Sequence, residues 1–230
     1  HRDLHSFPTR RSSDLPWQNI ELGVEGLEHR TGDAARWDGK ERPGYYLIDS
    51  WDWPAWGLPE PSGAKVSGGR VWVNVHTLKQ LAIVGIEPTV HESYTWAVTT
   101  RYLTGPGKAL SQARTALQAA PGDDQSARPV LSQVKLLYAA TVGKLAERDH
   151  AEDYHLWRPD WQDHIVSATK TQILRVVHQI QETTGVSPLV VDRDAVFFAS
   201  AEADPIKAWP GDPGKLGTKL GAWKPAYSAE

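Results

Sequence analysis

The first half of the chain alternates short runs of apolar and polar residues with turn-forming residues. Strict alternation is the period of a half-buried strand. Residues 77–85 predict a short helix, with Thr77 as its N-cap and Gly85 as its end. Residues 16–44 have weak periodicity and predict loop with short strands. The alternating pattern predicts strands at 45–51, 68–77 and 89–98.

Apolar residues in the second half recur with the 3.6-residue period of amphipathic helices. Helices are expected at 107–120, about 127–148 and about 161–183. Gly185 ends the third helix, and residues 188–200 then predict strand, tight turn and strand. Together these elements predict an α+β fold. The apolar stripes are Val130, Val134, Leu137 and Val142 in the second helix, and Ile165, Ala168, Ile173, Val176, Val177 and Ile180 in the third.

Residues 1–15, HRDLHSFPTRRSSDL, have neither periodicity nor the plan of a signal peptide. A widely used short-read sequencing adapter translates to this segment letter for letter. We therefore interpret it as a translated adapter artefact that is not native, and expect it to pack on nothing. The natural protein is then expected to begin upstream of Pro16.

Composition narrows the classes of function. The net charge is −3 and cysteine is absent. A mildly acidic chain makes no global case for binding nucleic acid, so any such binding must use a few local cations. The lack of cysteine excludes disulfides and thiolate metal sites and agrees with a cytoplasmic location. No apolar run reaches the roughly 20 residues that cross a bilayer, so no membrane partner is expected.

Two polar motifs favour structural interpretations. GPGKALS resembles a phosphate loop, but Tyr102 stands where that loop needs its first glycine, so a plain helix start is predicted. His150, Asp153 and His155 match no common metal spacing and predict a solvated loop.

Three tryptophans, Trp51, Trp53 and Trp56, lie close together beside proline. Such a row can stack bases or sugars, but it more often forms a packing ridge. We expect the packing role.

The stretch PLVVDRDAVFFAS places Asp192 and Asp194 between two apolar runs. Side chains at i and i+2 of a strand point the same way, so an extended Asp-x-Asp aims both carboxylates at one point. Neighbouring carboxylates raise each other's pKa. A divalent cation removes this conflict, and Mg²⁺ (or Mn²⁺) suits such oxygen ligands. The alternative is a plain hairpin whose Asp-Arg-Asp turn leaves both acids in water.

Four segments, in order, resemble motifs of family B DNA polymerases, above all those of the protein-primed phage and plasmid group. KLLYAATVGK, 135–144, aligns without a gap with the family's K-L-x-x-N-S-x-Y-G-K. IVSATK, 165–170, aligns with I-T-A-x-A-R, and VVDRDA, 190–195, with Y-x-D-T-D-S. LGAWK, 220–224, aligns with L-G-x-x-K. The order and spacing of the four motifs carry the resemblance, which extends over about 68–224.

The resemblance implies an antiparallel palm sheet with a helical fingers segment, truncated at the N-terminus. It implies DNA-directed DNA synthesis by two-metal phosphoryl transfer, with primer-template DNA and deoxynucleoside triphosphates as partners and a terminal protein as a further candidate. By position, Asp194 would be the principal metal ligand and Asp192 its helper. The positions implied in substrate binding are Lys135 at the triphosphate, Gly143 at the nascent base pair, Lys224 at a primer or template phosphate, and Lys144 and Lys170 beside them.

The chain also departs from the family pattern. Val142 replaces the tyrosine that packs under the nucleotide sugar, and Lys170 replaces an arginine. The upstream carboxylate of D-x-x-S-L-Y-P has no good counterpart, because the segment from Asp49 is one residue too short. We place that aspartate in sequence upstream. Further departures are Ala139, Ala140, Arg193 and Ala195.

Two alternatives therefore remain open. One is a degenerate polymerase-like protein that binds DNA ends or nucleotide without synthesis, and the other is an α+β domain of different ancestry. The expected divisions are the artefact at 1–15, palm-like strands and loops at 16–106, fingers-like helices at 107–186, and the metal hairpin with a Lys/Gly-rich tail at 187–230.

Overall fold

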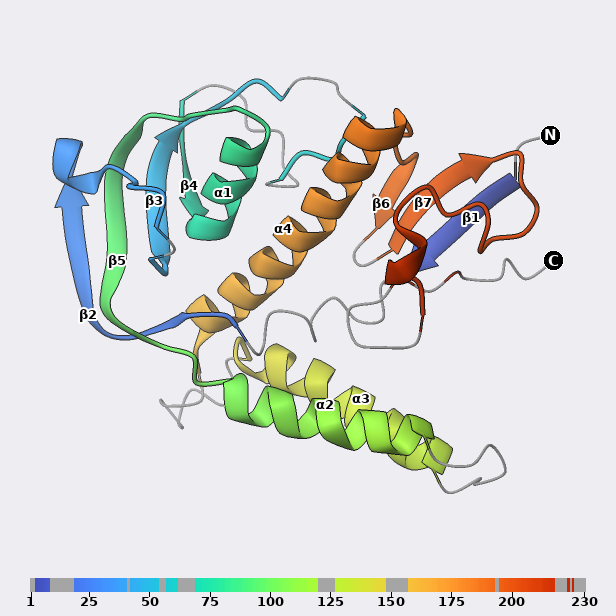
Figure 1. Ribbon diagram of the computed structural model, residues 1–230. Helices are drawn as coiled ribbons and strands as arrows, with labels where there is room; N and C mark the ends of the chain where they lie inside the picture. The colour runs from blue at the N-terminus through green and yellow to red at the C-terminus, as the bar shows by residue number, and fades with distance from the viewer. Residues whose placement is uncertain are drawn as a thin grey trace.

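The computed structural model places one long helix, α4 (Pro159–Thr184), between two antiparallel sheets (Figure 1). A pair of helices lies below them. The structure describes residues 3–8, 19–40, 42–53, 57–61, 69–119, 127–147, 157–192, 195–217, 223 and 225. The mixed helices and antiparallel strands confirm the predicted α+β class.

The larger sheet has four strands in the order β2-β5-β3-β4. The predicted strands are present as β3 (Gly44–Asp49), β4 (Arg70–Asn74) and β5 (Val90–Thr100). The prediction of loop with short strands for 16–44 did not specify β2 (Leu22–Thr31), a ten-residue edge strand paired along β5. Only the start of β2 is buried, so its sequence lacks the alternation of a half-buried strand.

Helix α1 (Val75–Ile83) packs on one face of this sheet. Its N-cap is Asn74 and not Thr77 as predicted, because the Asn74 side chain accepts hydrogen bonds from the backbone N–H groups of His76 and Thr77. Gly85, with φ of 79°, follows the helix as predicted. The core beneath α1 contains Tyr46, Ile48, Trp51, Val73, Val75, Leu78 and Leu81.

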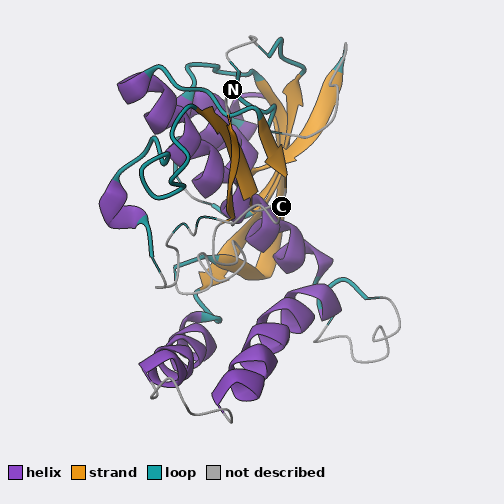
Figure 2. Ribbon diagram, turned by 90° about the vertical axis from the view of Figure 1, so that its right-hand side faces the viewer, coloured by secondary structure: helices purple, strands orange, loops and turns teal. Residues whose placement is uncertain are grey.

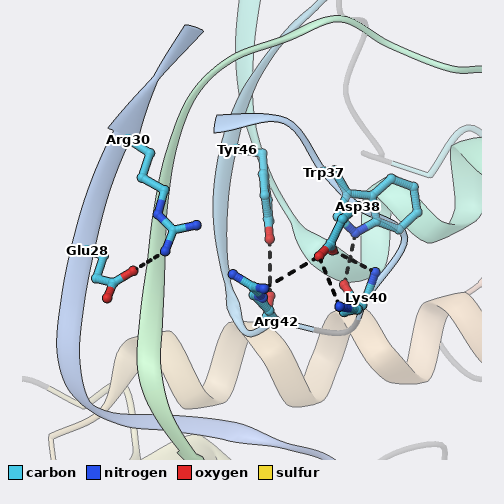
Figure 3. Close-up of polar contacts among 7 residues, drawn as sticks. All are labelled: Glu28, Arg30, Trp37, Asp38, Lys40, Arg42 and Tyr46. Atoms are coloured by element: carbon cyan, nitrogen blue, oxygen red, sulfur yellow. Dashed lines mark hydrogen bonds and ion pairs between the residues drawn. The ribbon is translucent and has the colours of Figure 1, made fainter. Parts of the chain in front are cut away.

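Polar contacts hold the loop between β2 and β3, which includes the short helix η2 (Gly32–Ala35) (Figure 3). The Trp37 indole N–H donates to the Lys40 carbonyl at 3.0 Å, and the Lys40 backbone N–H donates to the Asp38 carboxylate at 3.0 Å. The Tyr46 hydroxyl donates to the Arg42 carbonyl at 3.4 Å. The loop is thereby fixed at the edge of the core beneath α1.

Helices α2 (Thr104–Ala119) and α3 (Ala127–Lys144) lie side by side and project from the body (Figures 1 and 2). Both agree with the predicted helical segments. The predicted apolar stripe of α3 is buried only at its end: Val142 is 7% exposed, whereas Val130 and Leu137 are 49% and 53% exposed. The projecting part of α3 therefore packs little on the body.

Helix α4 joins the two sheets. Its first turns contact β2: the Trp161 indole N–H donates to the Gly23 carbonyl at 2.7 Å, and the Arg158 guanidinium lies 4.2 Å from the Trp161 ring centre. A Cβ at Gly23 would lie 2.2 Å from the Trp96 ring, so only glycine allows this close approach. The predicted stripe is confirmed by the buried side chains of Ile165, Ile173, Val177 and Ile180.

The smaller sheet has the order β1-β7-β6, with β6 (Val190–Asp192) and β7 (Ala195–Ser200) forming the predicted hairpin. Val196 and Phe198 of β7 pack with α4, Trp209 and Trp223. The tail includes a short 3-10 helix, η4 (Pro213–Lys215).

The expectation that residues 1–15 pack on nothing is wrong for Asp3–Pro8, which form β1 antiparallel to β7. The edge of β7 offers free backbone N–H and C=O groups, and an extended segment can satisfy them through its backbone alone. Pairing of β1 therefore requires no side chains fitted to this fold.

The tryptophan row has the expected packing role where the structure describes it. Trp51 is 9% exposed in the core beneath α1, and the Trp53 indole N–H donates to the Leu58 carbonyl at 2.9 Å. Trp56 lies outside the described residues, as do His150, Asp153 and His155. Among the described helices, none combines the length and apolarity that a bilayer crossing needs.

Candidate functional site

The hairpin holds one predicted metal ligand within the described residues. Asp192 is the last residue of β6, pairs with Ala195 and is exposed. Asp194 and Arg193 lie outside the described residues, so the convergence of the two carboxylates stays a prediction. The position of Asp192 at the tip of an antiparallel hairpin agrees with the sequence interpretation.

Lys170 lies beside this hairpin. Lys170 and Leu174 of α4 line a cavity of about 170 Å³ together with Val191 of β6 and the segment from Pro59 to Pro61. Asp192 follows Val191 directly, and the Lys170 side chain is exposed. The fold thus places Lys170 beside the strand that ends at Asp192.

The predicted substrate-binding residues of the fingers lie on or after α3. Lys144 is the last residue of α3 and is exposed. Gly143 has no described atom within 4 Å of the position that a Cβ would take. The Lys135 side chain and all of Lys224 lie outside the described residues, so their directions stay predictions. Gly143 borders open space, as an approach by a ligand would require.

Asp49 is the nearest match to the upstream aspartate of the resembled motif. It does not lie in the sheet that contains the hairpin. It ends β3 in the four-stranded sheet and accepts a bond of 2.7 Å to His91 Nε2. Within the described ranges, no group of three or more His, Cys, Asp or Glu side chains is placed to hold a metal. The described part of the hairpin site therefore supplies a single carboxylate.

Val142, the position that the motif resemblance aligns with a tyrosine, has a structural role. It is 7% exposed and packs in a cluster with Leu103 of the β5–α2 connection and Trp161 and Ile165 of α4. A buried aliphatic side chain offers no aromatic surface to a nucleotide sugar.

A second cavity, with a volume of about 390 Å³, has a polar lining. No sequence motif indicated it. It lies between α1, α4 and the residues that precede β2. Its lining includes Glu21, His76, Lys79, Thr171, Gln172 and Arg175. Burial, followed by the charge of Arg175, lowers the pKa of Lys79 to about 8. Its residues come from four separate segments, so no local pattern in the chain marks it.

A pair of histidines lies at this cavity: His76 lines it and is partly buried, and His164 is buried behind it. His164 is 1% exposed, and its ring contacts those of His76, Tyr45 and Trp96 at centroid distances of 5.5, 5.7 and 6.2 Å. Burial lowers the pKa of His164 to about 4 and that of His76 to about 3. Both histidines are therefore neutral at pH 7.

Asn74 connects this cluster to α1. Its amide N–H groups donate to Asp163 at 2.8 Å and to Ser167 at 2.6 Å, while its oxygen caps α1. The start of α1 and the first half of α4 are thereby held in one relative position.

The fold is similar to part of phi29 DNA polymerase. Against that protein complexed with primer-template DNA in the post-translocation binary complex, the TM-score is 0.62 at 11% identity, covering 97% of this chain and 42% of that chain. Against the ternary complex with incoming nucleotide, the TM-score is 0.62 at 10% identity over 96% of this chain and 42% of that chain. Against the complex with single-stranded DNA it is 0.55 at 12% identity.

Searches of protein families and of curated proteins give no match. The chain spans less than half the length of the polymerase chains whose fold it shares. At this identity the likeness shows the fold alone, which is similar to part of that DNA polymerase.

Proposed function

We propose that this chain is a palm-and-fingers segment of a template-directed DNA polymerase, of the family B, protein-primed kind that its motifs resemble. The observation that carries the proposal is the juxtaposition of Lys170 and the Asp192 hairpin around one cavity, within a fold shared with part of a DNA polymerase. The motif order in the sequence and the fold likeness are independent of each other, and both indicate the same class of protein.

In this proposal the chain's residues bind and orient the substrates. The exposed ammonium groups of Lys170 and Lys144 hold phosphate groups of the nucleotide or the primer-template. Lys135 has the same role at the triphosphate, and Lys224 at the primer or template strand. Gly143 allows the nascent base pair to approach the α3 backbone, since the space beside it is open.

Asp192 and Asp194 would hold Mg²⁺ or Mn²⁺, for which carboxylate oxygens are suitable ligands. Such an ion supplies activation of the 3′-hydroxyl and stabilisation of the leaving pyrophosphate. Two-metal chemistry needs carboxylates from a second strand as well. The proposal places that strand at the edge of β7 that β1 occupies, because an extended segment pairs there.

One observation favours the alternative of a protein that binds DNA ends or nucleotide without synthesis. Val142 is packed in the core where the family's tyrosine would contact the nucleotide sugar. A site without that aromatic contact retains phosphate binding through its lysines but loses a surface that positions the sugar for chemistry.

The proposal is tested by measuring deoxynucleoside triphosphate binding with Mn²⁺ and primer extension on the 230-residue chain. We expect binding that weakens about tenfold or more in the double variant Asp192→Asn/Asp194→Asn and in Lys170→Gln, because each removes a charge-assisted contact. Glu87→Gln, an exposed carboxylate between α1 and β5, is the matched control and should bind like the wild type.

No nucleotide incorporation is expected from this chain, because the residues that the structure describes provide a candidate metal carboxylate from one strand only. Binding that is indifferent to Asp192, Asp194 and Lys170 would refute the proposed site. Robust synthesis by the chain would instead show that a further metal carboxylate lies within it, and would refute the placement of that ligand upstream. A protein extended upstream that synthesises DNA and loses synthesis on Asp194→Ala would support the enzyme over the binding protein.

A further inference from the structure

The four-stranded sheet has one face that packs on α1 and one that is turned away from it. Successive side chains of a strand point to opposite faces of a sheet. Tyr46 of β3 and Val73 of β4 pack in the core with α1. Their neighbours Leu47 and Trp72, which are paired in the register, therefore point to the outer face.

A row of aromatic rings crosses this outer face. The His29 ring of β2 is stacked on Tyr94 of β5, with 4.5 Å between the ring centres. Tyr94 lies 5.6 Å from Trp72 of β4, although β3 separates their strands. The start of α4 covers the adjoining end of the face, where His164 lies 6.2 Å from Trp96. Trp72 is nevertheless 43% exposed, and an exposed aromatic patch on an antiparallel sheet indicates a binding surface.

The polar groups beside the row are paired within the chain. His29 Nε2 lies 2.7 Å from a Glu92 oxygen, and one Asp49 oxygen lies 2.7 Å from His91 Nε2 and 3.9 Å from Arg70 Nε. Arg70 is the one lysine or arginine that the four described strands direct to this face. A single-stranded nucleic acid would need several cations beside the rings to hold its phosphates. The charges therefore favour a protein as the occupant of this face.

We propose that the outer face of the four-stranded sheet binds a second copy of this chain, with the two aromatic rows packed on each other. Sheets pack face to face at a distance of about 10 Å, and a symmetric dimer uses the same patch on both copies. A two-fold axis parallel to the strands and between the central strands β5 and β3 gives full overlap of the two faces. This axis places β3 of one copy over β5 of the other, so the partner's Asp49 lies opposite His91 and the charges are complementary.

The size of the face sets the expected strength of the dimer. Four strands spaced about 4.8 Å apart are about 19 Å wide, and α4 covers one end of them. The interface is therefore at the low end of the usual size range, which is typical of reversible association. We expect a dissociation constant of about 10–100 μM. The dimer does not depend on nucleotide binding at the hairpin, so failure of one proposal leaves the other unaffected.

The test is analytical ultracentrifugation of the full chain from about 1 μM to about 1 mM, a range that spans the expected dissociation constant. The variants Trp72→Thr and Tyr94→Thr each remove one ring of the row, and threonine keeps the strand propensity. Ile206→Thr is the matched control, because Ile206 is an exposed apolar residue that follows β7. The indole N–H signal of Trp72, identified by its loss in Trp72→Thr, is followed by NMR over the same range. A second series contains an oligothymidylate.

We expect the mass to increase from one chain to two over this range, with the Trp72 signal shifting in parallel. Association should weaken about tenfold or more in Trp72→Thr and Tyr94→Thr, because aromatic side chains dominate the binding energy of such interfaces. Ile206→Thr should associate like the wild type. The wild-type Trp72 signal tests the proposal even where a variant fails to fold.

Three results would overturn the proposal. The first is a single chain at every concentration. The second is a dimer that both ring variants leave unchanged, since pairing of strand edges uses backbone groups alone. The third is a shift of the Trp72 signal by the oligothymidylate in a chain that remains single, which would identify nucleic acid as the occupant.

Discussion

Replacing His164 by phenylalanine should make the protein less sensitive to acid. His164 is 1% exposed, and neither ring nitrogen has a hydrogen-bond partner within the described residues. Phenylalanine keeps the aromatic contacts with Tyr45, His76 and Trp96 and leaves no polar atom unsatisfied. At neutral pH, the substitution therefore removes no hydrogen bond.

The effect of pH follows from the lowered pKa values. His164 and His76 titrate near 4 and 3 in the folded chain, against an ordinary value of 6.5. Between these values the unfolded chain binds more protons than the folded chain, so the free energy of unfolding decreases as the pH falls below 6.5. The stability that neutral histidines contribute is fully present above pH 6.5. At pH 5 each histidine costs the folded state about 2 kcal/mol.

The assay is urea denaturation at pH 7.5 and pH 5.0. Between these two conditions, we expect His164→Phe to lose about 2 kcal/mol less of its free energy of unfolding than the wild type. Leu27→Gln is the control, because Leu27 is an exposed residue of β2 without a titratable group, so its replacement should leave the pH dependence unchanged. Equal losses in wild type and His164→Phe would show that His164 is not a buried neutral histidine, and would refute the reasoning.

Three further predictions concern the fold. Asn74→Ala should lower the free energy of unfolding by about 2–3 kcal/mol, because the α1 cap and the hydrogen bonds to Asp163 and Ser167 are lost together. Urea denaturation measures this loss, and a change below about 0.5 kcal/mol would contradict the role of Asn74. Gly143→Ala should stabilise the chain by about 1 kcal/mol, because alanine has a higher helix propensity and no described atom would clash with its Cβ. The same substitution should weaken nucleotide binding in a calorimetric titration. Unchanged nucleotide affinity would remove Gly143 from the proposed site. Deleting residues 1–15 should preserve the helical circular dichroism but increase self-association in size-exclusion chromatography, because the edge of β7 is exposed; loss of helical signal would show that β1 is required for the fold.

The periodicity of apolar residues predicted those helices and strands whose side chains are buried at regular intervals. Strands β3 and β5, helices α2, α3 and α4, and the β6–β7 hairpin were all indicated by periodicity. The edge strand β2 was predicted only as part of a region of loop with short strands, because Glu25, Glu28 and Arg30 leave it without an apolar alternation. Its formation depends on backbone pairing with β5, which lies about 70 residues away in the chain.

In the candidate site, too, the sequence indicated only those residues that a local motif marks. Motif order indicated Asp192 and Lys170, and the fold places Lys170 on a cavity that is also lined by Val191, the neighbour of Asp192 in β6. The polar cavity between α1 and α4 has no motif, because tertiary packing alone brings α1 to α4. Thr77 was the expected cap of α1, but Asn74 caps it and also bonds α4, a role that only the packed structure reveals.

The most direct test of the central claim is paramagnetic broadening of backbone amide signals by Mn²⁺ in the 230-residue chain. The account predicts that low concentrations of Mn²⁺ broaden the signals of Val191, Asp192, Ala195 and Lys170 first, because Asp192 and Asp194 hold the ion and Lys170 lies beside the hairpin. The effect should disappear in Asp192→Asn/Asp194→Asn and persist in Glu87→Gln. Broadening centred elsewhere, or unchanged in the double variant, would contradict a metal site at this hairpin.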